Sequence, residues 1–254
     1  MTASISAGLG VIAVTCLAFE ARIARRSGVT VLCNGRRERL RERVELASER
    51  AAGLISFGVA GGLDDGLRPG DWIVGAGVVT DTGRHEADAG WARRLCQALP
   101  AARFGEISGQ DEPIARPDQK YALRRRDGTI AVDNESHVVA EIAARKRIPF
   151  AIARVVLDPA WRALPPAALE PLNPDGTADI AAVMRSIGRA PRQLAGLAMV
   201  ATDALRARSE LRLGCARLGP ALGFLHAVAE NEAVAAQASE TSEVEPATPF
   251  AAAI

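Results

Sequence analysis

Aromatic residues, lysines and an excess of charge of either sign are scarce in this sequence of 254 residues. Phe, Trp and Tyr make up 4% of it, too few for a surface on which single-stranded nucleic acids stack. The 31 Lys and Arg residues balance 30 Asp and Glu residues to a net charge of +1, so no overall field attracts a phosphate backbone. The lysines are Lys120 and Lys146, and no function follows from their rarity. We therefore expect no nucleic-acid partner.

Metal-ligand spacings are also missing. The cysteines are spread widely, at Cys16, Cys33, Cys96 and Cys215. Without a CxxC pair or a Cys/His cluster a zinc site is not expected, and four cysteines make a sparse disulfide framework for this length. His85 beside Glu86 lacks the HExxH spacing of zinc hydrolases. We expect no metal, buried reduced thiols and, from these, a cytoplasmic protein.

Long hydrophobic runs are missing as well. Residues 7–19 are apolar, but they are too short to span a bilayer. No Lys or Arg precedes Glu20, so the run lacks the positively charged start of a signal peptide. We expect a buried first strand there that enters a turn.

The remaining pattern is typical of an α/β protein. Hydrophobic residues make up 48% of the chain and charged residues 24%, as in soluble globular domains. Short apolar runs predict strands at residues 9–15, 29–33, 54–58, 71–83, 101–108, 129–132 and 149–156. Helical patterns lie between them, at residues 36–50, 88–99, 121–126 and 135–147. This alternation indicates βαβ units, so we expect three layers, with a mixed, mostly parallel sheet covered by helices on both faces.

The chain changes character after residue 160. Five prolines between residues 165 and 191 break it into short helices, and residues 203–238 read as one long helix. Residues 239–254 are of low complexity, which is typical of a disordered tail. No internal repeat or interruption marks a second domain, so we expect a single domain over residues 1–238.

A glycine-rich segment follows the third predicted strand. In SFGVAGG, residues 56–62, small residues leave backbone N–H groups open to a ligand. Ligands bind at the carboxyl ends of strands in open parallel sheets. The segment is neither GxGxxG nor a phosphate-binding P-loop. A tight strand-to-helix turn is an equally good interpretation.

Two more strand ends carry polar residues. In AVDNESH, residues 131–137, Asp133 and Glu135 are expected to cap a helix, and His137 is expected on the helix surface rather than as a ligand. In IARVVLDPA, residues 152–160, the strand ends at Asp158. A partly desolvated Asp at this edge can keep its proton near neutral pH and act as a general acid.

In this order and spacing, the three segments resemble the purine nucleoside phosphorylase and methylthioadenosine–adenosylhomocysteine nucleosidase superfamily over about residues 8–160. The sequence is most similar to the hopanoid-associated phosphorylase branch, thought to remove adenine from adenosylhopane. LPPAALEPL, residues 164–172, and PRQL, residues 191–194, carry that finer resemblance because they lie outside the superfamily motifs.

The resemblance implies roles for four charged side chains. Asp158 corresponds to the acid that protonates purine N7. Glu135 corresponds to the carboxylate that binds the ribose hydroxyls, and Arg154 to an arginine that orients it. Glu20 falls where nucleosidases keep the glutamate that activates water.

Backbone atoms and two departures complete the implied substrate site. The backbone of Val59, Ala60 and Gly61 corresponds to the turn that lines base and ribose. Asn134 stands where the family usually has Met against the ribose, and Leu157 where Ser usually positions the acid. These exchanges point to an altered substrate or to an inactive member.

The implied activity is cleavage of the N-glycosidic bond of an adenosyl nucleoside, adenosylhopane above all, by hydrolysis or phosphorolysis. No cofactor is implied beyond phosphate as a co-substrate, for which Arg22 and Arg84 are candidate ligands. The alternative is a nucleoside-binding protein of the same fold with little or no turnover. A flavodoxin-like or NAD-binding protein is a third interpretation, but only Gly8 and Gly10 lie near the first strand.

A lipid-linked substrate needs an apolar entrance. Candidates are Trp161, Leu164, Leu169 and Leu172 in residues 160–200, which we expect to form a lid, a peripheral membrane contact or ordinary core. A homodimer is expected, because oligomers are typical of the superfamily.

Overall fold

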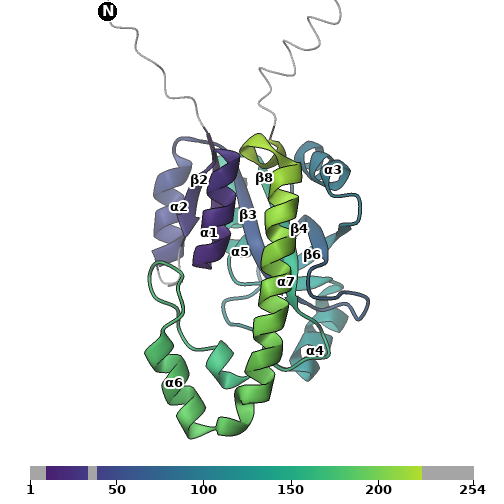
Figure 1. Cartoon of the computed structure of the whole chain (residues 1–254). Helices are drawn as coiled ribbons and strands as arrows, with labels where there is room; N and C mark the ends of the chain where they lie inside the picture. The colour runs from purple at the N-terminus through teal and green to yellow at the C-terminus, as the bar shows by residue number, and fades with distance from the viewer. Residues whose placement is uncertain (1–9, 34–38, 225–254) are drawn as a thin grey trace, which may run out of the picture. The chain divides into compact units, whose positions relative to one another are not determined.

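One mixed sheet organises the chain in a computed structural model, which describes residues 10–33 and 39–224 (Figure 1). The strands are β1 (Gly10–Thr15), β2 (Thr30–Cys33), β3 (Ala51–Gly62), β4 (Trp72–Thr80), β5 (Gly83–Glu86), β6 (Arg103–Gly109), β7 (Ala131–Asp133) and β8 (Phe150–Asp158). Five of their eight pairings are parallel, so the expected mixed, mostly parallel sheet is confirmed.

The middle of this sheet closes on itself. β3 pairs with β8, β8 with β4, β4 with β6, β6 with β7, and β7 again with β3. β1 and β2 extend from β3, and β5 extends from β4. The alternating pattern of the sequence predicted the strands, whereas this ring depends on pairings between distant segments.

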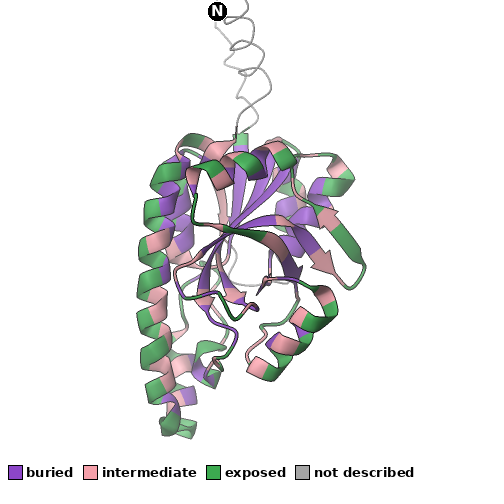
Figure 2. Ribbon diagram, turned by 90° about the vertical axis from the view of Figure 1, so that its right-hand side faces the viewer, coloured by how far each residue is buried: buried purple, intermediate pink, exposed green. Residues whose placement is uncertain are grey.

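Helices cover both faces of the sheet, as expected. The helices are α1 (Ala18–Ala24), α2 (Leu40–Ser48), α3 (Ala89–Ala98), α4 (Pro117–Asp127), α5 (Ser136–Lys146), α6 (Ile180–Arg189) and α7 (Leu194–Leu218). Side chains of α1, α3 and α7 share one apolar cluster with the strands, and those of α2 and α5 share another. Figure 2 shows the buried strands between helices that are exposed along their outer sides.

Burial on both faces explains why β8 is apolar apart from Arg154 and Asp158. Successive side chains of a strand point to opposite faces. Ala151, Ala153 and Val155 belong to the cluster under α7, and Phe150, Ile152 and Val156 to the cluster under α5. A strand that is buried on both faces reads as a continuous apolar run, and its end at Asp158 is held firmly in place.

Two local predictions are wrong. The long helix predicted at residues 203–238 is α7, which begins at Leu194 and ends at Leu218, because Gly219 at φ 67° and Pro220 stop it. The glycine-rich segment is no turn, because β3 continues through Gly62 and pairs with β7 and β8. The remainder of the predicted helix beyond residue 224 and the predicted disordered tail at residues 239–254 lie outside the described residues.

The cysteines and His137 also differ from expectation. All four thiols are free, but only Cys215 is buried, while Cys16, Cys33 and Cys96 are partly exposed. His137 is buried rather than on the helix surface, because the first turn of α5 packs under Gly109, and its Nε2 lies 3.1 Å from Asp111 Oδ1. No helix of the described chain is long and apolar enough to cross a membrane.

Candidate active site

A cavity of about 690 Å³ opens where β1, β3, β7 and β8 end. Its floor is formed by those strand ends and its walls by residues 112–114, 164 and 168–173. Seven of the predicted site residues line it, namely Glu20, Val59, Ala60, Gly61, Asn134, Glu135 and Asp158. Arg154 is fully buried and lies behind the wall. Residues far apart in the sequence are thus brought to one site.

Glu20, in the first turn of α1, is fully buried and is held by three backbone donors. Its Oε2 accepts from the N–H groups of Cys16 and Leu17 at 2.9 and 2.8 Å, and its Oε1 from Val59 N–H at 2.7 Å. Burial raises the pKa of Glu20 to about 7, against the opposing effects of Arg154 and these N–H groups. Glu20 can therefore take up or release a proton near neutral pH.

Gly58 leaves the space that Glu20 needs. A Cβ there would lie 2.4 Å from Glu20 Oε1 and 2.9 Å from an Arg154 nitrogen, and its φ of 152° disfavours other residues. The small residues of SFGVAGG thus admit a carboxylate and a guanidinium as well as a ligand.

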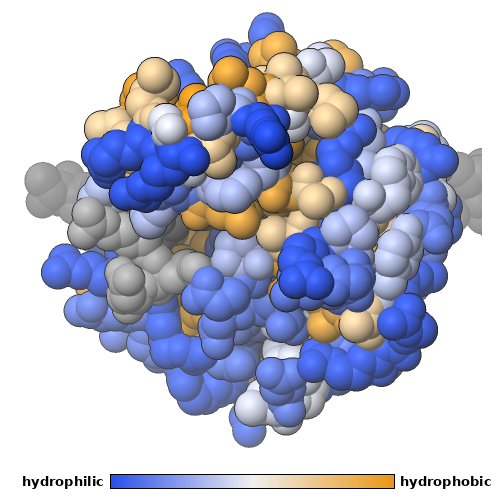
Figure 3. Space-filling view, turned by 90° about the horizontal axis from the view of Figure 1, so that it is seen from below, coloured by the Kyte–Doolittle hydropathy of each residue, from blue (hydrophilic) through white to orange (hydrophobic). Residues whose placement is uncertain are grey.

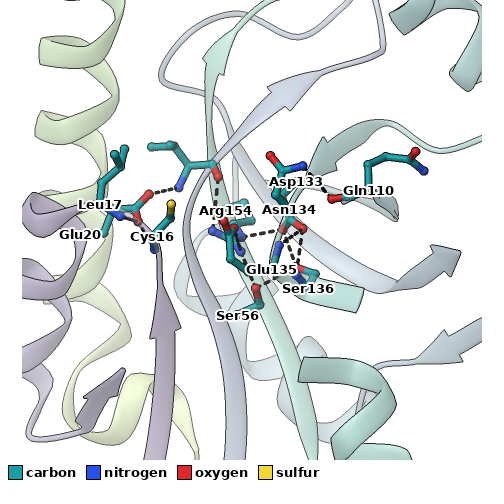
Figure 4. A network of polar contacts seen from close by, with 11 residues as sticks. Cys16, Leu17, Glu20, Ser56, Gln110, Asp133, Asn134, Glu135, Ser136 and Arg154 are labelled. Carbon is teal, nitrogen blue, oxygen red and sulfur yellow. Dashed lines mark hydrogen bonds and ion pairs between the residues drawn. The ribbon is translucent and has the colours of Figure 1, made fainter. Parts of the chain in front are cut away.

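Arg154 holds the acids at the end of β7 (Figure 4). Its Nε lies 2.8 Å from Asp133 Oδ2, and its NH2 donates to Glu135 Oε2 at 3.0 Å and to Ser56 Oγ at 2.5 Å. Asp133 caps α5 as predicted by accepting from Ser136 N–H at 2.9 Å, while Glu135 caps nothing. Glu135 is left to face the cavity.

Cys16 borders Glu135 on the cavity wall. Burial raises the pKa of Glu135, since the effect of Arg154 is outweighed and Asp133 adds to the rise. Burial also raises the pKa of the Cys16 thiol, and Glu135 raises it further. This thiol therefore stays protonated and does not act as a nucleophile.

Asp158 ends β8 beside a buried lysine. Lys120 Nζ on α4 donates to Asp158 Oδ2, and the side chain of Lys120 is fully buried. Burial raises the pKa of Asp158, and Lys120 opposes the rise. Two acidic regions, one around Glu20 and Glu135 and one at Asp158, thus meet in a single cavity.

The two departures from the family pattern both lie on the cavity wall. Asn134 Nδ2 donates to Gln110 O at 2.7 Å, which ties the β7–α5 turn to the segment after β6. Leu157 is partly buried and packs against the apolar cluster under α7. The charged group in contact with Asp158 is the Lys120 ammonium, which comes from α4.

Three of the four residues named as candidates for an apolar entrance lie on the cavity wall. Leu164, Leu169 and Leu172 line the cavity. Trp161 does not, because it lies under the Arg68 guanidinium, 4.4 Å from the ring centroid. The segment after β8 therefore contributes an apolar wall.

The charge of the wall is of one sign. The cavity is lined by acidic residues from every part of it, namely Glu20, Glu112, Asp133, Glu135, Asp158, Glu170 and Asp179. No Lys, Arg or His of the described residues lines it. The predicted phosphate ligands lie elsewhere, since Arg22 is exposed and donates to Ala18 O, and Arg84 pairs with Glu106.

Sequence reasoning missed Lys120, Cys16 and Ser56. A lysine within the Arg-rich stretch of residues 116–126 reads as part of a solvated helix face. Its rarity as one of two lysines was the one available signal. Within the described residues, no group of three or more His, Cys, Asp or Glu side chains is placed to hold a metal ion.

A sequence profile of the Phosphorylase superfamily matches residues 36–198 of the chain. The match includes the glycine-rich segment and the ends of β7 and β8, but not Glu20. No curated protein matches this chain in sequence.

Solved structures share the fold. A 5′-methylthioadenosine/S-adenosylhomocysteine nucleosidase from Neisseria meningitidis, bound to methylthio-immucillin-A, has 16% identity and a TM-score of 0.57, covering 82% of this chain and 98% of that one. An S-adenosylhomocysteine nucleosidase from Streptococcus pyogenes has 16% identity and a TM-score of 0.56, covering 79% and 99%. Futalosine hydrolase from Helicobacter pylori has 15% identity and a TM-score of 0.53, covering 71% and 98%. At such identities the likeness concerns the fold.

Proposed function

Because the chain belongs to the Phosphorylase superfamily, we propose that it is a nucleosidase, which hydrolyses the N-glycosidic bond of an adenosyl nucleoside. The observation that carries this proposal is the meeting of Glu20, Glu135 and Asp158 on the wall of one cavity. The neighbours named above include nucleosidases bound to adenosine-like compounds, which supports an adenine nucleoside as the substrate.

Each of the three carboxyl groups has its own role in the reaction. Asp158 gives a proton to purine N7 while the bond between C1′ and N9 breaks and its electron pair passes to the purine. Glu135 accepts hydrogen bonds from the ribose hydroxyls as positive charge develops on the sugar. Glu20 takes a proton from water, whose oxygen bonds to C1′. The products are adenine and the free sugar, and no cofactor is needed.

Water is favoured over phosphate as the nucleophile. Seven acids and no Lys, Arg or His of the described residues line the cavity, so it offers no cation to hold a phosphate anion. A carboxyl group whose pKa burial raises to about 7, as in Glu20, suits proton removal from water near neutral pH.

The proposed substrate is adenosylhopane or another adenosyl compound with a large apolar 5′ group. Support comes from the resemblance of residues 164–172 and 191–194 to the hopanoid-associated branch. Leu164, Leu169 and Leu172 add an apolar wall on which such a group can pack.

The test is adenine release from adenosylhopane and from 5′-methylthioadenosine, each with and without phosphate, followed by chromatography and mass spectrometry. We expect adenine and a free sugar at equal rates in both buffers, and faster release from adenosylhopane. Release that requires phosphate and yields a sugar 1-phosphate would replace hydrolysis by phosphorolysis. Tight nucleoside binding without adenine release would favour the binding protein, the alternative that Asn134 and Leu157 motivate.

A peripheral membrane contact fits an apolar substrate. On α6, Ile180 and Met184 are 67% and 60% exposed, next to the exposed Arg185 and Arg189. The view from below shows hydrophobic side chains gathered among hydrophilic ones (Figure 3). We propose that this helix contacts anionic bilayers from the cytoplasm. Cosedimentation with anionic vesicles, lost in Ile180→Asp, would support the contact, and equal cosedimentation of both proteins would exclude it.

A homodimer remains our proposal for the assembly, because the superfamily forms oligomers. Light scattering on the purified protein measures its mass directly. A mass of one chain at all concentrations would contradict the dimer.

A further inference from the structure

Lys120 is a charged side chain that the reaction described above does not use. It lies on α4 and is fully buried, although lysine is almost never fully buried unless it is paired. Its ammonium donates to Asp158 Oδ2, to Pro159 O at 2.9 Å and to Arg162 O at 3.3 Å. Three acceptors match the three donors of an ammonium group, so the geometry fits a fully protonated lysine.

These contacts orient the acid at the end of β8. Lys120 occupies Oδ2 of Asp158, which leaves Oδ1 for a ligand in the cavity. A Cβ on Gly61 would lie 3.5 Å from both carboxyl oxygens, so Asp158 packs against the backbone of β3. The carboxyl group is therefore fixed from two sides, by α4 and by β3.

Two positively charged side chains act on Asp158. Lys120 faces it from α4, and Arg162 acts on it from the segment after β8. Arg162 itself is paired with Asp203 on α7. The Lys120 ammonium is thus the charge in direct contact with Asp158.

We propose that Lys120 is a positioning residue for the nucleosidase reaction, which fixes Asp158 and stabilises the carboxylate that forms when Asp158 gives its proton to the purine. The proposal rests on the proposed function of the site. Asp158 takes a proton from solvent, transfers it to N7 as the C1′–N9 bond breaks, and returns to the ion pair. The positive charge of Lys120, in direct contact with Asp158, lowers the cost of the negative charge that develops on that carboxyl group.

A missing ammonium leaves a recognisable signature. Without it, Asp158 holds its proton to higher pH but gives it up less readily. Burial raises the pKa of Asp158 and Lys120 opposes that rise, which agrees with this direction. Turnover then falls while the alkaline limit of the pH profile moves upward, a combination that loss of packing alone does not produce.

The experiment compares kcat for adenine release from pH 5 to 10 in the wild type, Lys120→Met, Lys120→Arg and Lys146→Met. We expect Lys120→Met to lose about 10²-fold in kcat, as for other groups that assist proton transfer, with its alkaline limb at least about one pH unit higher. Lys120→Arg keeps the charge and the position of the limb. Lys146→Met, which removes the chain's other lysine from its pair with Glu45, behaves as the wild type. An unmoved limb in Lys120→Met would overturn the proposal.

A second measurement does not need turnover. Thermal unfolding of Lys120→Met and of the double variant Lys120→Met/Asp158→Asn is followed at pH 5 and pH 8. In the single variant the buried Asp158 carboxylate loses its partner, so its Tm relative to the wild type falls more at pH 8 than at pH 5. The added Asp158→Asn change is expected to remove this extra loss, and its persistence would contradict the proposal. If the wild type releases no adenine, the proposed function fails while this measurement still decides whether Lys120 stabilises the Asp158 carboxylate.

Discussion

Arg154 and Lys120 are both fully buried behind the wall of the cavity, but they face different numbers of acids. Arg154 pairs with Asp133 and Glu135, and its charge also acts on Glu20. Lys120 pairs with Asp158 and otherwise meets backbone carbonyls. Arg154 thus serves three carboxyl groups on the side of the cavity proposed for the sugar. Lys120 serves one carboxyl group, Asp158, on the side proposed for the base.

The two regions therefore differ in charge balance. Three ionised carboxylates around one guanidinium leave an excess of negative charge, and burying such charge is costly. Retaining protons relieves it, in line with the pKa of Glu20 near 7 and the raised pKa of Glu135. Asp158 and Lys120 form a pair without excess charge. Burial raises the pKa of Asp158 as well, so the two regions differ in the number of carboxyl groups that share one cation.

The largest effect is expected from Asp158→Asn, which changes the acid proposed to protonate the base. It removes the proton donor while keeping an oxygen for Lys120, so kcat for adenine release falls by about 10²- to 10⁴-fold. Steady-state kinetics at pH 7 measures the loss. Asp118→Asn, which changes an exposed Asp of α4, is the matched control and keeps full activity. Full activity in Asp158→Asn would mean that another group protonates the base.

Arg154→Met is the corresponding change on the side of the cavity proposed for the sugar, where it removes the cation. It leaves buried carboxylates without their cation, and loss of one partner of a buried pair costs about 3–5 kcal/mol. We expect the loss to be larger at pH 8 than at pH 5, because burial raises the pKa of Glu20 and Glu135. We also expect it to be larger than in Lys120→Met, where one carboxylate is affected. Urea unfolding of both variants at both pH values checks this. Equal losses would show that the number of acids does not matter.

The stability of the wild type itself is expected to depend on Glu20. Burial raises its pKa from 4.5 to about 7, so the folded state holds this proton more tightly than the unfolded state. Stability from this group is complete below about pH 4.5 and lost as the pH rises through 7, by about 3 kcal/mol. Unfolding free energies between pH 4.5 and 8 measure the loss, after subtraction of the same series for Glu20→Gln. Identical series would contradict the raised pKa.

Glu20→Gln also tests the assignment of the base. If Glu20 accepts a proton from water, kcat of the wild type rises with pH through about 7. The variant is expected to lose about 10²-fold in kcat together with that acidic limb. A pH profile of turnover shows both. An acidic limb that survives in the variant would assign it to Glu135 instead.

The smallest effect is expected from Asn134→Met, which restores the residue usual in the family. The change removes the hydrogen bond to Gln110 O and adds apolar surface beside the ribose site. We expect KM to change by about tenfold or less with kcat preserved, because Asn134 neither gives a proton to the purine nor takes one from water. KM for adenosylhopane and for 5′-methylthioadenosine is the measurement. A loss of kcat at unchanged KM would place Asn134 in the chemistry.

Local patterns predicted much of this fold and part of the site. The apolar runs that end at Asp133 and Asp158 are strands buried on both faces, and their short length distinguishes them from helices. Lys120 escaped notice because its partner lies 38 residues away and becomes a partner only when α4 packs on the end of β8. His137 was misplaced because a helix surface cannot be assigned before its covering loop is known. The end of α7 at Gly219 and Pro220, by contrast, was a local signal that was overlooked.

The ring of pairings among β3, β8, β4, β6 and β7 has a consequence for self-association. A strand whose two sides are both paired offers no backbone groups to another chain, and closure is a means by which proteins avoid edge-to-edge aggregation. In the described part of the chain the sheet ends at β2 and β5. β5 carries Arg84 and Glu86, whose charges discourage pairing, whereas β2 reads Thr-Val-Leu-Cys. A destabilised chain is therefore expected to aggregate first through β2, away from the strand ends that carry Glu135 and Asp158.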